Sequence, residues 1–366
     1  MSKIPSTMQA VILTGHGGPE MLEVKQDWSV PTPAADEVLI KVGAAGVNNT
    51  DINTRIGWYS KSVTADTDAA ASSAGDIEVD TSDSSWAGAS IQFPRIQGAD
   101  VCGTIVAVGT GVSSNRIGER VLCVAMQPQP DSKAGLNCIT LGSEMDGGFA
   151  EYVTVKSDMT HSIMSSDLTD AELASFPCAA STAENMLDRI GLKAGETVLI
   201  TGASGGVGSA AVQLAKLRGA MVTAIAATEK HDFVRSLGAD YLIDRGDTLE
   251  QLSYDAVVDL VVGPQWNELI HALKRGGRYI TAGAIAGPIA ELDLRTVYLR
   301  DLTIAGSTFQ PPRIFANLVA AIDTGALKPV VSKTYPLSQI GAAQADFVAK
   351  KYPGKLVLVP DRLMAQ

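Results

Sequence analysis

The chain has 366 residues, of which 46% are hydrophobic and 19% charged, and its formal net charge is −11. This length allows two domains with cores of their own, and the hydrophobic content excludes a disordered chain. The negative charge argues against a nucleic-acid or anionic-membrane partner, because such surfaces need clustered Lys and Arg.

No targeting or membrane segment is expected. Residues 1–10 lack the apolar core of a signal peptide, and no apolar run approaches the roughly 20 residues of a membrane span. The four cysteines show no C-x-x-C spacing, which is typical of buried thiols in a reducing compartment. We therefore expect a cytoplasmic protein.

The first part of the chain is predicted to be β-rich. Short apolar runs occur at Gln9–Leu13, Glu37–Val42 and Gly103–Val108, separated by Gly and Pro. A further strand-like run, Gly148–Val155, closes this part.

Residues 63–90 differ from their surroundings. This segment is rich in Ser, Ala, Asp and Gly, has no Lys or Arg, and holds six acids, Asp66, Asp68, Asp76, Glu78, Asp80 and Asp83. Its composition predicts a mobile surface loop. The alternative is a lid whose charge repels anionic substrates.

From about Asp167 the pattern changes to helices alternating with short apolar strands. The strand candidates are Thr197–Ile200, Met221–Ile225, Tyr241–Ile243, Ala256–Leu260, Arg278–Ala282 and Leu302–Gly306. Six strands with crossover helices predict an α/β domain with a doubly wound parallel sheet, the Rossmann arrangement. The tail ends in the strand-like run Lys355–Val359, which we expect to rejoin the β-rich part and make that domain discontinuous.

The most informative stretch is VLITGASGGVG, residues 198–208, followed by the helix-compatible run Ser209–Leu217. Strand, tight turn and helix in this order are typical of a dinucleotide site. Glycines allow close approach of the backbone, and the helix N-terminus offers free N–H groups to a pyrophosphate. The motif is AxGxxG, so a glycine-rich turn of another α/β protein is the alternative. We expect cofactor contacts from Ala203, Ser204, Gly205, Gly206, Val207 and Gly208.

The end of the second strand candidate indicates which nicotinamide cofactor is used. NAD sites place a carboxylate there, about 20 residues past the glycines, but this chain has Ala227 and Thr228. Lys230 and Arg245 could reach a 2′-phosphate, so the sequence predicts NADPH over NADH. Two alternatives stay open: an inward-turned Glu229 would accept NADH, and Lys230 could be a solvated lysine at a helix start.

These motifs sit in a pattern that resembles the medium-chain dehydrogenase/reductase superfamily, most closely its zinc-independent quinone oxidoreductase and enone reductase branch. The similarity covers almost the whole chain. The segments that carry it are GHGGPEMLEV, GVNNTDINTRIGWY at 46–59, GADVCGTIVAVG at 98–109, GERVLC, DGGFAEYV, PCAASTAENML at 177–187, the glycine loop and TVYLRDLTIAGST at 296–308.

The resemblance implies a GroES-like β-rich catalytic domain and a Rossmann NADP-binding domain with a six-stranded sheet. We expect the first to comprise 1–160 plus 313–366 and the second 161–312. It also implies a homodimer or homotetramer, and Leu302–Gly306 could be the edge strand through which two Rossmann domains pair.

The resemblance also bears on metal binding, because zinc alcohol dehydrogenases share this fold. Their catalytic zinc uses two cysteines and a histidine, at positions that here hold Asn48, Ala99 and Cys178. A catalytic zinc needs about three protein ligands, so we expect no metal.

Further site residues are implied by the resemblance. Asn48 would lie near the nicotinamide, and Tyr59 matches the proton-donating tyrosine of related 2-enoyl-thioester reductases. Thr182 matches the family threonine at the nicotinamide end. Gly283 is expected to pass the nicotinamide ring, with Ser307 further along the same domain. Glu184 replaces a frequent aromatic residue and would place an acid near the mouth of the site.

Without a metal, hydride addition to a conjugated acceptor is more plausible than alcohol oxidation. The sequence therefore predicts an NADPH-dependent oxidoreductase acting on a small quinone or α,β-unsaturated carbonyl, with Tyr59 and Asn48 as the catalytic residues. One alternative is an enoyl-thioester reductase. Another is a non-catalytic NADPH-binding redox sensor or structural protein.

Overall fold

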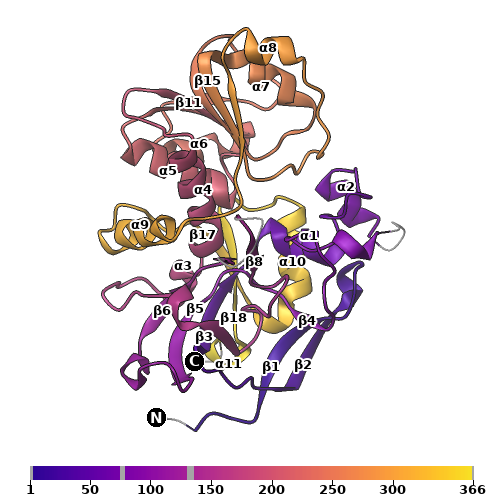
Figure 1. Cartoon of the computed structure of the whole chain (residues 1–366), viewed down its shortest axis with the longest axis vertical. Helices are drawn as coiled ribbons and strands as arrows, with labels where there is room; N and C mark the ends of the chain where they lie inside the picture. The colour runs from indigo at the N-terminus through magenta and orange to yellow at the C-terminus, as the bar shows by residue number, and fades with distance from the viewer. Residues whose placement is uncertain (1–2, 75–78, 130–135, 365–366) are drawn as a thin grey trace.

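The computed structural model describes residues 3–74, 79–129 and 136–364. Figure 1 shows two domains stacked along the long axis, one holding the parallel sheet and the other holding both ends of the chain. No helix in these ranges is long and apolar enough to cross a membrane.

The terminal domain is built on a seven-stranded sheet of order β10-β6-β5-β3-β18-β17, with β9 also pairing with β3. The strands are β3 (Glu37–Gly46), β5 (Cys102–Val108), β6 (Arg120–Cys123), β9 (Tyr152–Lys156), β10 (Thr160–Ser162), β17 (Val331–Pro336) and β18 (Lys355–Val359). The last strand pairs antiparallel with β3, from the other end of the chain. The predicted return of the tail is therefore confirmed.

Smaller elements complete this domain. A second sheet has the order β2-β1-β4, and β7 pairs with β8. Their bounds are β1 (Thr7–Leu13), β2 (Leu22–Ser29), β4 (Arg95–Ile96), β7 (Met126–Pro128) and β8 (Cys138–Thr140). The helices are α1 (Asn49–Ile56), α2 (Thr67–Ser72), α3 (Asp170–Leu173), α10 (Ile340–Val348) and α11 (Asp361–Met364).

The other domain has a six-stranded parallel sheet of order β13-β12-β11-β14-β15-β16, which confirms the predicted fold class. Its strands are β11 (Thr197–Ile200), β12 (Met221–Ile225), β13 (Tyr241–Ile243), β14 (Tyr254–Asp259), β15 (Leu273–Thr281) and β16 (Thr303–Gly306). Its helices are α4 (Pro177–Arg189), α5 (Gly206–Leu217), α6 (His231–Ser236), α7 (Trp266–Ala272), α8 (Leu294–Tyr298) and α9 (Pro312–Asp323).

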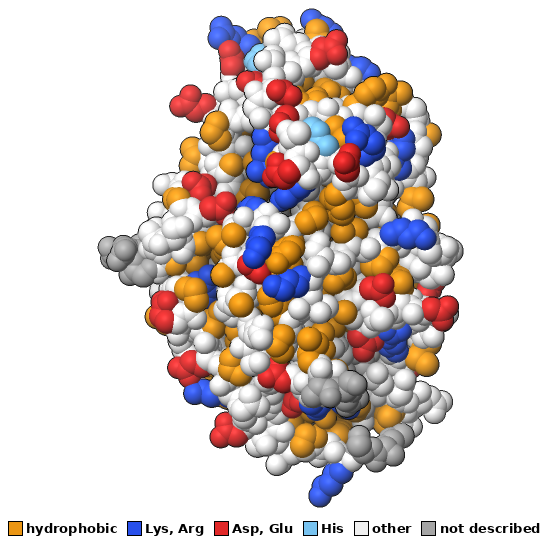
Figure 2. All heavy atoms as spheres, turned by 180° about the vertical axis from the view of Figure 1, so that it is seen from behind, with side chains coloured by type: hydrophobic (Ala, Val, Ile, Leu, Met, Phe, Trp, Pro, Cys, Tyr) orange, Lys and Arg blue, Asp and Glu red, His pale blue; other side chains and the backbone are white. Residues whose placement is uncertain are grey.

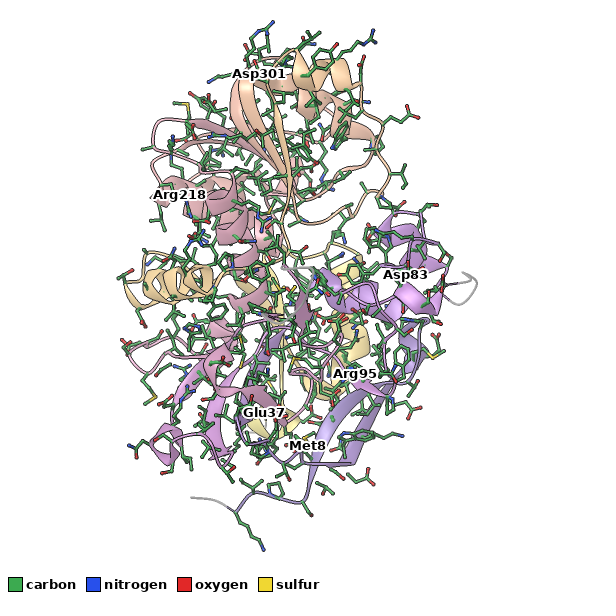
Figure 3. The ribbon with its side chains drawn as sticks, viewed as in Figure 1. Met8, Glu37, Asp83, Arg95, Arg218 and Asp301 are labelled. Atoms are coloured by element: carbon green, nitrogen blue, oxygen red, sulfur yellow. The ribbon has the colours of Figure 1, made fainter. Side chains whose placement is uncertain are left out.

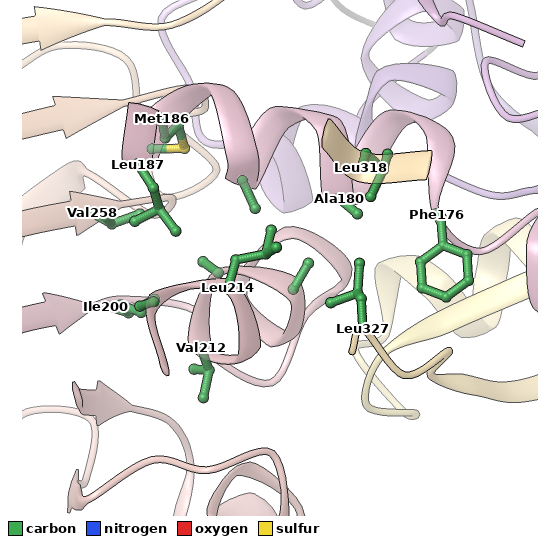
Figure 4. Close-up of a cluster of buried hydrophobic side chains, with 14 of the residues drawn as sticks. Phe176, Ala180, Met186, Leu187, Ile200, Val212, Leu214, Val258, Leu318 and Leu327 are labelled. Carbon is green, nitrogen blue, oxygen red and sulfur yellow. The ribbon is translucent and has the colours of Figure 1, made fainter. Parts of the chain in front are cut away.

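Alternating side chains of the central strands bury both faces of this sheet. Val198 and Ile200 join a cluster with α4, α5 and α9, whereas Leu199 packs with α7 on the opposite face. Figure 4 shows the first cluster, in which Leu214 of α5 lies between α5 and α4, and Leu187 of α4 lies beside Val258 of β14. This cluster also includes residues of β3, β5 and β6, so apolar packing is continuous between the domains. The boundaries at 160/161 and 312/313 stay a proposal.

The acidic segment is more structured than predicted. It contains α2, and Thr67, Ala70, Ser84 and Ser85 are buried. The Asp66 side chain caps α2, accepting a hydrogen bond from the Ala69 N–H at 2.7 Å. The prediction of a surface loop is therefore wrong for these residues, which form a helix and pack against the rest of the chain. Asp76 and Glu78 lie outside the described residues.

Candidate functional site

The glycine loop links β11 to α5 as the motif predicts. Gly205 is the N-cap of α5, whose first-turn N–H groups have no acceptor within the helix. A Cβ at Gly208 would lie 2.2 Å from the Gly202 carbonyl oxygen, so a larger residue cannot pack there. Gly202 itself has φ +57°, in the left-handed region that favours glycine. The loop thus forms an anion cradle at a helix N-terminus.

The other predicted cofactor residues follow the ends of neighbouring strands. Because β11, β12, β13, β15 and β16 are parallel, their carboxyl ends share one edge of the sheet. The residues gathered there are Ala203, Ser204, Gly205, Gly206, Val207, Gly208, Ala227, Thr228, Lys230, Arg245, Gly283 and Ser307. Thr182 lies on α4 instead, only partly buried. In open parallel sheets of this kind, ligands bind outside the carboxyl ends of the strands.

Three cations face one another beyond β12, and we call Lys230, Arg245 and Lys350 the cationic rim. Burial lowers the pKa of Lys230, and so do the nearby charges of Arg245 and Lys350. The Lys230 Nζ donates to the Lys350 carbonyl oxygen at 2.7 Å. Positive charges that lower the pKa of Lys230 would be stabilised by an anionic ligand.

Carboxylates stand close to this rim as well. Asp244 accepts hydrogen bonds from the Thr228 hydroxyl and from the Arg245 N–H. Glu229 is exposed. Its charge acts on Lys230, whose pKa it raises.

Asn48, Asp100 and Lys355 form a buried polar network beside the glycine loop. Their exposed fractions are 7%, 0% and 3%. The Lys355 ammonium donates to Asp100 Oδ2 at 2.8 Å, to Asn48 Oδ1 at 2.6 Å and to the Val47 carbonyl oxygen at 2.9 Å. The Lys355 stem packs against Gly206 of the glycine loop. The network thus connects the catalytic domain to the cofactor cradle.

The Asn48 carboxamide is fully engaged in this network. Its Nδ2 donates to Asp100 Oδ2 at 2.8 Å and to the Gly46 carbonyl oxygen at 3.3 Å, while its Oδ1 accepts from Lys355. In this arrangement it has no free N–H for a substrate. Its catalytic role stays a prediction, and the geometry favours a positioning role.

Asp51 lies beside the buried network. Its carboxylate accepts from the Asn48 N–H at 2.7 Å and from the Gly98 N–H at 3.3 Å. Burial raises the pKa of Asp51 to about 7, against the opposing effects of the Asn48 N–H and of Lys355. This carboxyl therefore titrates near neutrality, rather than at its usual pH of about 4.

The ring of Tyr59 lies 5.0 Å from that of Trp86 in an edge-on contact. Burial raises the pKa of Tyr59 well above its usual range, and hydrogen bonds with Thr50 and Asn53 only partly oppose this. The charges of Cys178 and Asp51 add to the shift, which places the phenol near both. Tyr59 is thus a neutral donor at physiological pH.

The donor set does not fit a zinc ion. Of the three positions considered, Ala99 has no ligand atom and Asn48 already accepts from the Lys355 cation. Burial raises the pKa of the Cys178 thiol far above its usual range, whereas a metal ligand must be a thiolate. In the described part of the chain, no group of three or more His, Cys, Asp or Glu is placed to hold a metal.

Two residues of the expected site, Glu184 and Ser307, are engaged by other side chains of the protein. Glu184 does not place a free acid at the mouth, because its carboxylate pairs with Arg218 at 2.7 Å and is buried. Figure 3 shows Arg218 on the outer side of the α/β domain, away from α2. The Ser307 hydroxyl, which follows the end of β16, accepts a hydrogen bond from Asn185 Nδ2 at 2.8 Å. This hydrogen bond fixes the position of the hydroxyl.

Sequence reasoning missed Lys355, Asp100 and Lys350. A signal was present for two of them, since Lys355 begins the apolar run KLVLV and Asp100 stands inside GADVCG. A charge within an apolar strand is rarely buried unless it is paired. It also missed Gly354, whose N–H donates to the Ser204 carbonyl oxygen at 2.7 Å.

These features define a two-domain oxidoreductase with a nicotinamide cofactor site, and comparisons with known proteins agree. The family profile for the alcohol dehydrogenase GroES-like domain matches residues 34–165, and that for zinc-binding dehydrogenase matches 206–324. A solved structure named "putative alcohol dehydrogenase", from Sinorhizobium meliloti 1021, is 45% identical with a TM-score of 0.86. The match covers 99% of each chain.

Two curated relatives add to this. The NADPH-dependent alkenal/one oxidoreductase of Arabidopsis thaliana is 29% identical, over 98% of this chain and 81% of the relative. The quinone oxidoreductase of Sus scrofa is 27% identical, over 96% and 98% respectively. The chain belongs to the medium-chain dehydrogenase/reductase superfamily, in its quinone oxidoreductase-like branch.

Proposed function

We propose that this protein is an NADPH-dependent oxidoreductase that transfers hydride to a quinone or an α,β-unsaturated carbonyl without a metal. The observation that carries this proposal is the phenol of Tyr59, kept neutral by burial beside Cys178 and Asp51. A protonated donor is what the oxygen of a conjugated carbonyl needs as negative charge develops on it. The named activities of the two curated relatives support the same substrate classes.

Each chain residue then has a definite task. A bound reduced nicotinamide would supply the hydride. The Tyr59 hydroxyl hydrogen-bonds the substrate carbonyl oxygen and protonates the enolate that forms when hydride adds to the β-carbon. Solvent then returns a proton to Tyr59. Asn48, Asp100 and Lys355 hold the pocket in place against the glycine loop.

NADPH is the proposed cofactor because of the cationic rim. Lys230 and Arg245 were predicted to meet a 2′-phosphate, and Lys350, which also pairs with Asp68 at 3.1 Å, approaches Lys230 from the other domain. Asp244 is already engaged by Thr228 and the Arg245 N–H, which argues against its serving as a ribose ligand.

An enoyl-thioester reductase is the second candidate, and the same Tyr59 favours it, since a thioester enolate also needs a proton. A non-catalytic NADPH-binding protein is less well supported, because such a protein has no need of a positioned phenol.

We also propose a cytoplasmic homodimer or homotetramer formed through β16, the edge strand of the parallel sheet. Exposed apolar side chains cluster in sequence near it, namely Leu294, Tyr298, Leu299 and Ile304. On the face in Figure 2, Lys and Arg are interspersed with Asp and Glu, which suits a small-molecule enzyme.

The test is consumption of NADPH and NADH with an ortho-quinone, a simple enone and a crotonyl thioester. NADPH-dependent reduction of the quinone or the enone is expected. A preference for the thioester would select the second candidate, and tight NADPH binding without turnover would select the non-catalytic protein.

A further inference from the structure

The carboxylate of Asp259, the last residue of β14, is fully buried and has no part in the proposed hydride transfer. Its Oδ1 accepts from the Val261 N–H at 2.9 Å and from the Val262 N–H at 3.1 Å. The same oxygen accepts from the Thr201 hydroxyl at 2.6 Å, and Oδ2 accepts from the Tyr279 hydroxyl at 2.7 Å. A buried carboxylate is costly unless such donors compensate for the loss of water, so this group depends on the position of all four.

The loop after β14 depends on Asp259 in turn, because of its backbone conformation. Val262 has φ +57°, in the left-handed region that a β-branched residue rarely adopts. The Val261 and Val262 N–H groups donate to the same oxygen of Asp259, and these two hydrogen bonds stabilise the unfavourable turn. Backbone strain maintained by such contacts is typical of ligand-binding loops.

Asp259 also connects this loop to the glycine loop. Thr201, whose hydroxyl donates to Asp259, directly precedes Gly202. The same hydroxyl accepts from the Leu260 N–H at 2.9 Å. A Cβ at Gly202 would lie 3.3 Å from the Val261 side chain, so the two loops approach each other closely. The start of the glycine loop is therefore positioned against the loop after β14.

A third loop is joined to the same group of residues. The Val261 carbonyl oxygen accepts from the Ala286 N–H at 2.9 Å, in the loop after β15. Tyr279 of β15 is 1% exposed, and its ring lies 5.9 Å from that of Trp266 in an edge-on contact. All three loops follow the carboxyl ends of neighbouring parallel strands, β11, β14 and β15, in the upper domain of Figure 1. Asp259 thus links the loops at the edge where such sheets bind ligands.

We propose that Asp259 is a positioning residue for cofactor binding, whose carboxylate holds the glycine loop and the loops after β14 and β15 in the arrangement that receives the dinucleotide. This inference rests on the proposed function, because it requires a nicotinamide dinucleotide at this edge. It also divides the work of the site. The cationic rim would recognise the 2′-phosphate, which NADPH alone carries, whereas Asp259 would act on the part that NADPH and NADH share.

The first test measures the dissociation constants of NADPH and NADH from the fluorescence of the cofactor, without any substrate. Asp259→Asn keeps the size of the side chain but replaces one oxygen by an NH₂ group, so at least one donor loses its acceptor. Both dissociation constants should rise roughly 10- to 100-fold, by the same factor. Asp323→Asn, at an exposed carboxylate of α9, is the matched control and should leave both unchanged. Unchanged affinities in Asp259→Asn would overturn the proposal.

A second substitution separates positioning of the turn from a general loss of structure. Val262→Gly removes the unfavourable φ, because glycine adopts the left-handed region without steric cost. In the Asp259→Asn background it should recover most of the lost affinity, and in the wild-type protein it should give no such gain. Urea unfolding shows that each variant is folded. A folded double variant that recovers nothing would show that Asp259 does not act through this turn.

Tyr279→Phe provides a milder change for the case in which Asp259→Asn does not fold. It keeps the ring contact with Trp266 and removes only the hydrogen bond to Asp259 Oδ2. Both dissociation constants should rise about threefold to tenfold. Unchanged values would contradict the proposal without any need for the Asp259 variant.

Binding and turnover distinguish this inference from the proposed function. If the wild-type protein binds NADPH but reduces no quinone or enone, the proposed reaction fails, and the binding data on Asp259→Asn still decide the inference. Lys230→Ala should weaken NADPH alone, so it is the internal comparison. A loss in Asp259→Asn that is confined to NADPH would assign Asp259 to phosphate recognition and overturn the proposed division. A wild-type protein that binds neither cofactor would refute both.

Discussion

The buried network and the cationic rim each contain a lysine, but the two lysines differ in burial and in the partners of their ammonium groups. Lys355 is 3% exposed, and its ammonium has three oxygen partners within 2.9 Å. Lys230 is only partly buried, donates to one carbonyl oxygen, and faces Arg245 and Lys350. The first lysine is paired within a buried network, whereas the second lies in a partly exposed group of cations, of which Lys350 also pairs with Asp68 at 3.1 Å.

This difference separates residues that build the site from residues that select its ligand. A fully paired ion in the interior costs much to disturb, so it fixes the relative position of the glycine loop and the pocket. Neighbouring cations that repel one another are stabilised when an anion binds between them, so they are suited to the recognition of an anionic ligand. The following predictions test this contrast.

Removal of Lys355 should have the largest effect on stability. Lys355→Met leaves the Asp100 carboxylate buried without a cation, which should lower the free energy of unfolding by about 3–5 kcal/mol. Lys25→Met is the control, because Lys25 pairs with Glu23 with its side chain 43% exposed, and should leave the free energy of unfolding nearly unchanged. Urea unfolding measures both. Similar small losses would show that the buried network is dispensable.

Removal of the Tyr59 hydroxyl should slow the proposed reaction and leave the stability of the folded protein nearly unchanged. Tyr59→Phe keeps the ring contact with Trp86 but removes the proton donor, so kcat for an enone should fall roughly 10²- to 10⁴-fold. Tyr241→Phe, at an exposed tyrosine, should leave kcat unchanged. Single-turnover kinetics with NADPH measure the chemical step. A loss confined to KM would instead assign Tyr59 to substrate binding.

The parallel sheet was predictable because its strands are short apolar runs bounded by turn residues. Thr197–Ile200, Met221–Ile225 and Tyr241–Ile243 are strands of this sheet with the predicted bounds, and Lys355–Val359 is a strand with the predicted bounds in the other domain. Each run packs with residues nearby in sequence or in the next strand, so local pattern and tertiary structure agree.

The acidic segment and the buried network were not predictable in the same way. The segment is held by contacts with remote residues, such as the Ser84 hydroxyl with His16 Nε2 at 2.9 Å and Asp68 with Lys350 at 3.1 Å. Asp83, labelled in Figure 3, accepts from the Lys61 N–H on the outer side of the segment. Lys355 and Asp100 are 255 residues apart, so no local sequence pattern could reveal that they pair.

Substitutions in the cationic rim should change the preference for NADPH over NADH, with a smaller effect than the substitutions of Lys355 and Tyr59. Lys230→Ala removes a charged donor from the proposed 2′-phosphate site, so KM for NADPH should rise roughly 10- to 100-fold. KM for NADH should change less than twofold. Lys328→Ala, at an exposed lysine elsewhere, is the control. Equal effects on NADPH and NADH would remove the rim from phosphate recognition.

The smallest effect concerns the pH dependence that Asp51 brings to the pocket. Its pKa is about 7 in the folded protein, against about 4 in an unfolded chain, so the folded state binds the proton more tightly. Stability from this group is therefore fully present below pH 4 and is lost as the pH rises to 7, by about 1.4 kcal/mol per pH unit at most.

The variant Asp51→Asn has no such proton, so its free energy of unfolding should lack this fall between pH 4 and 7. Asp27→Asn, at an exposed carboxylate, should keep the slope of the wild type. Urea unfolding from pH 5 to 8 distinguishes the two. An unchanged slope in Asp51→Asn would mean that this carboxyl stays ionised beside Lys355. The buried network would then hold two negative charges against one positive charge, and Asp51 would belong with the charged groups that build the site.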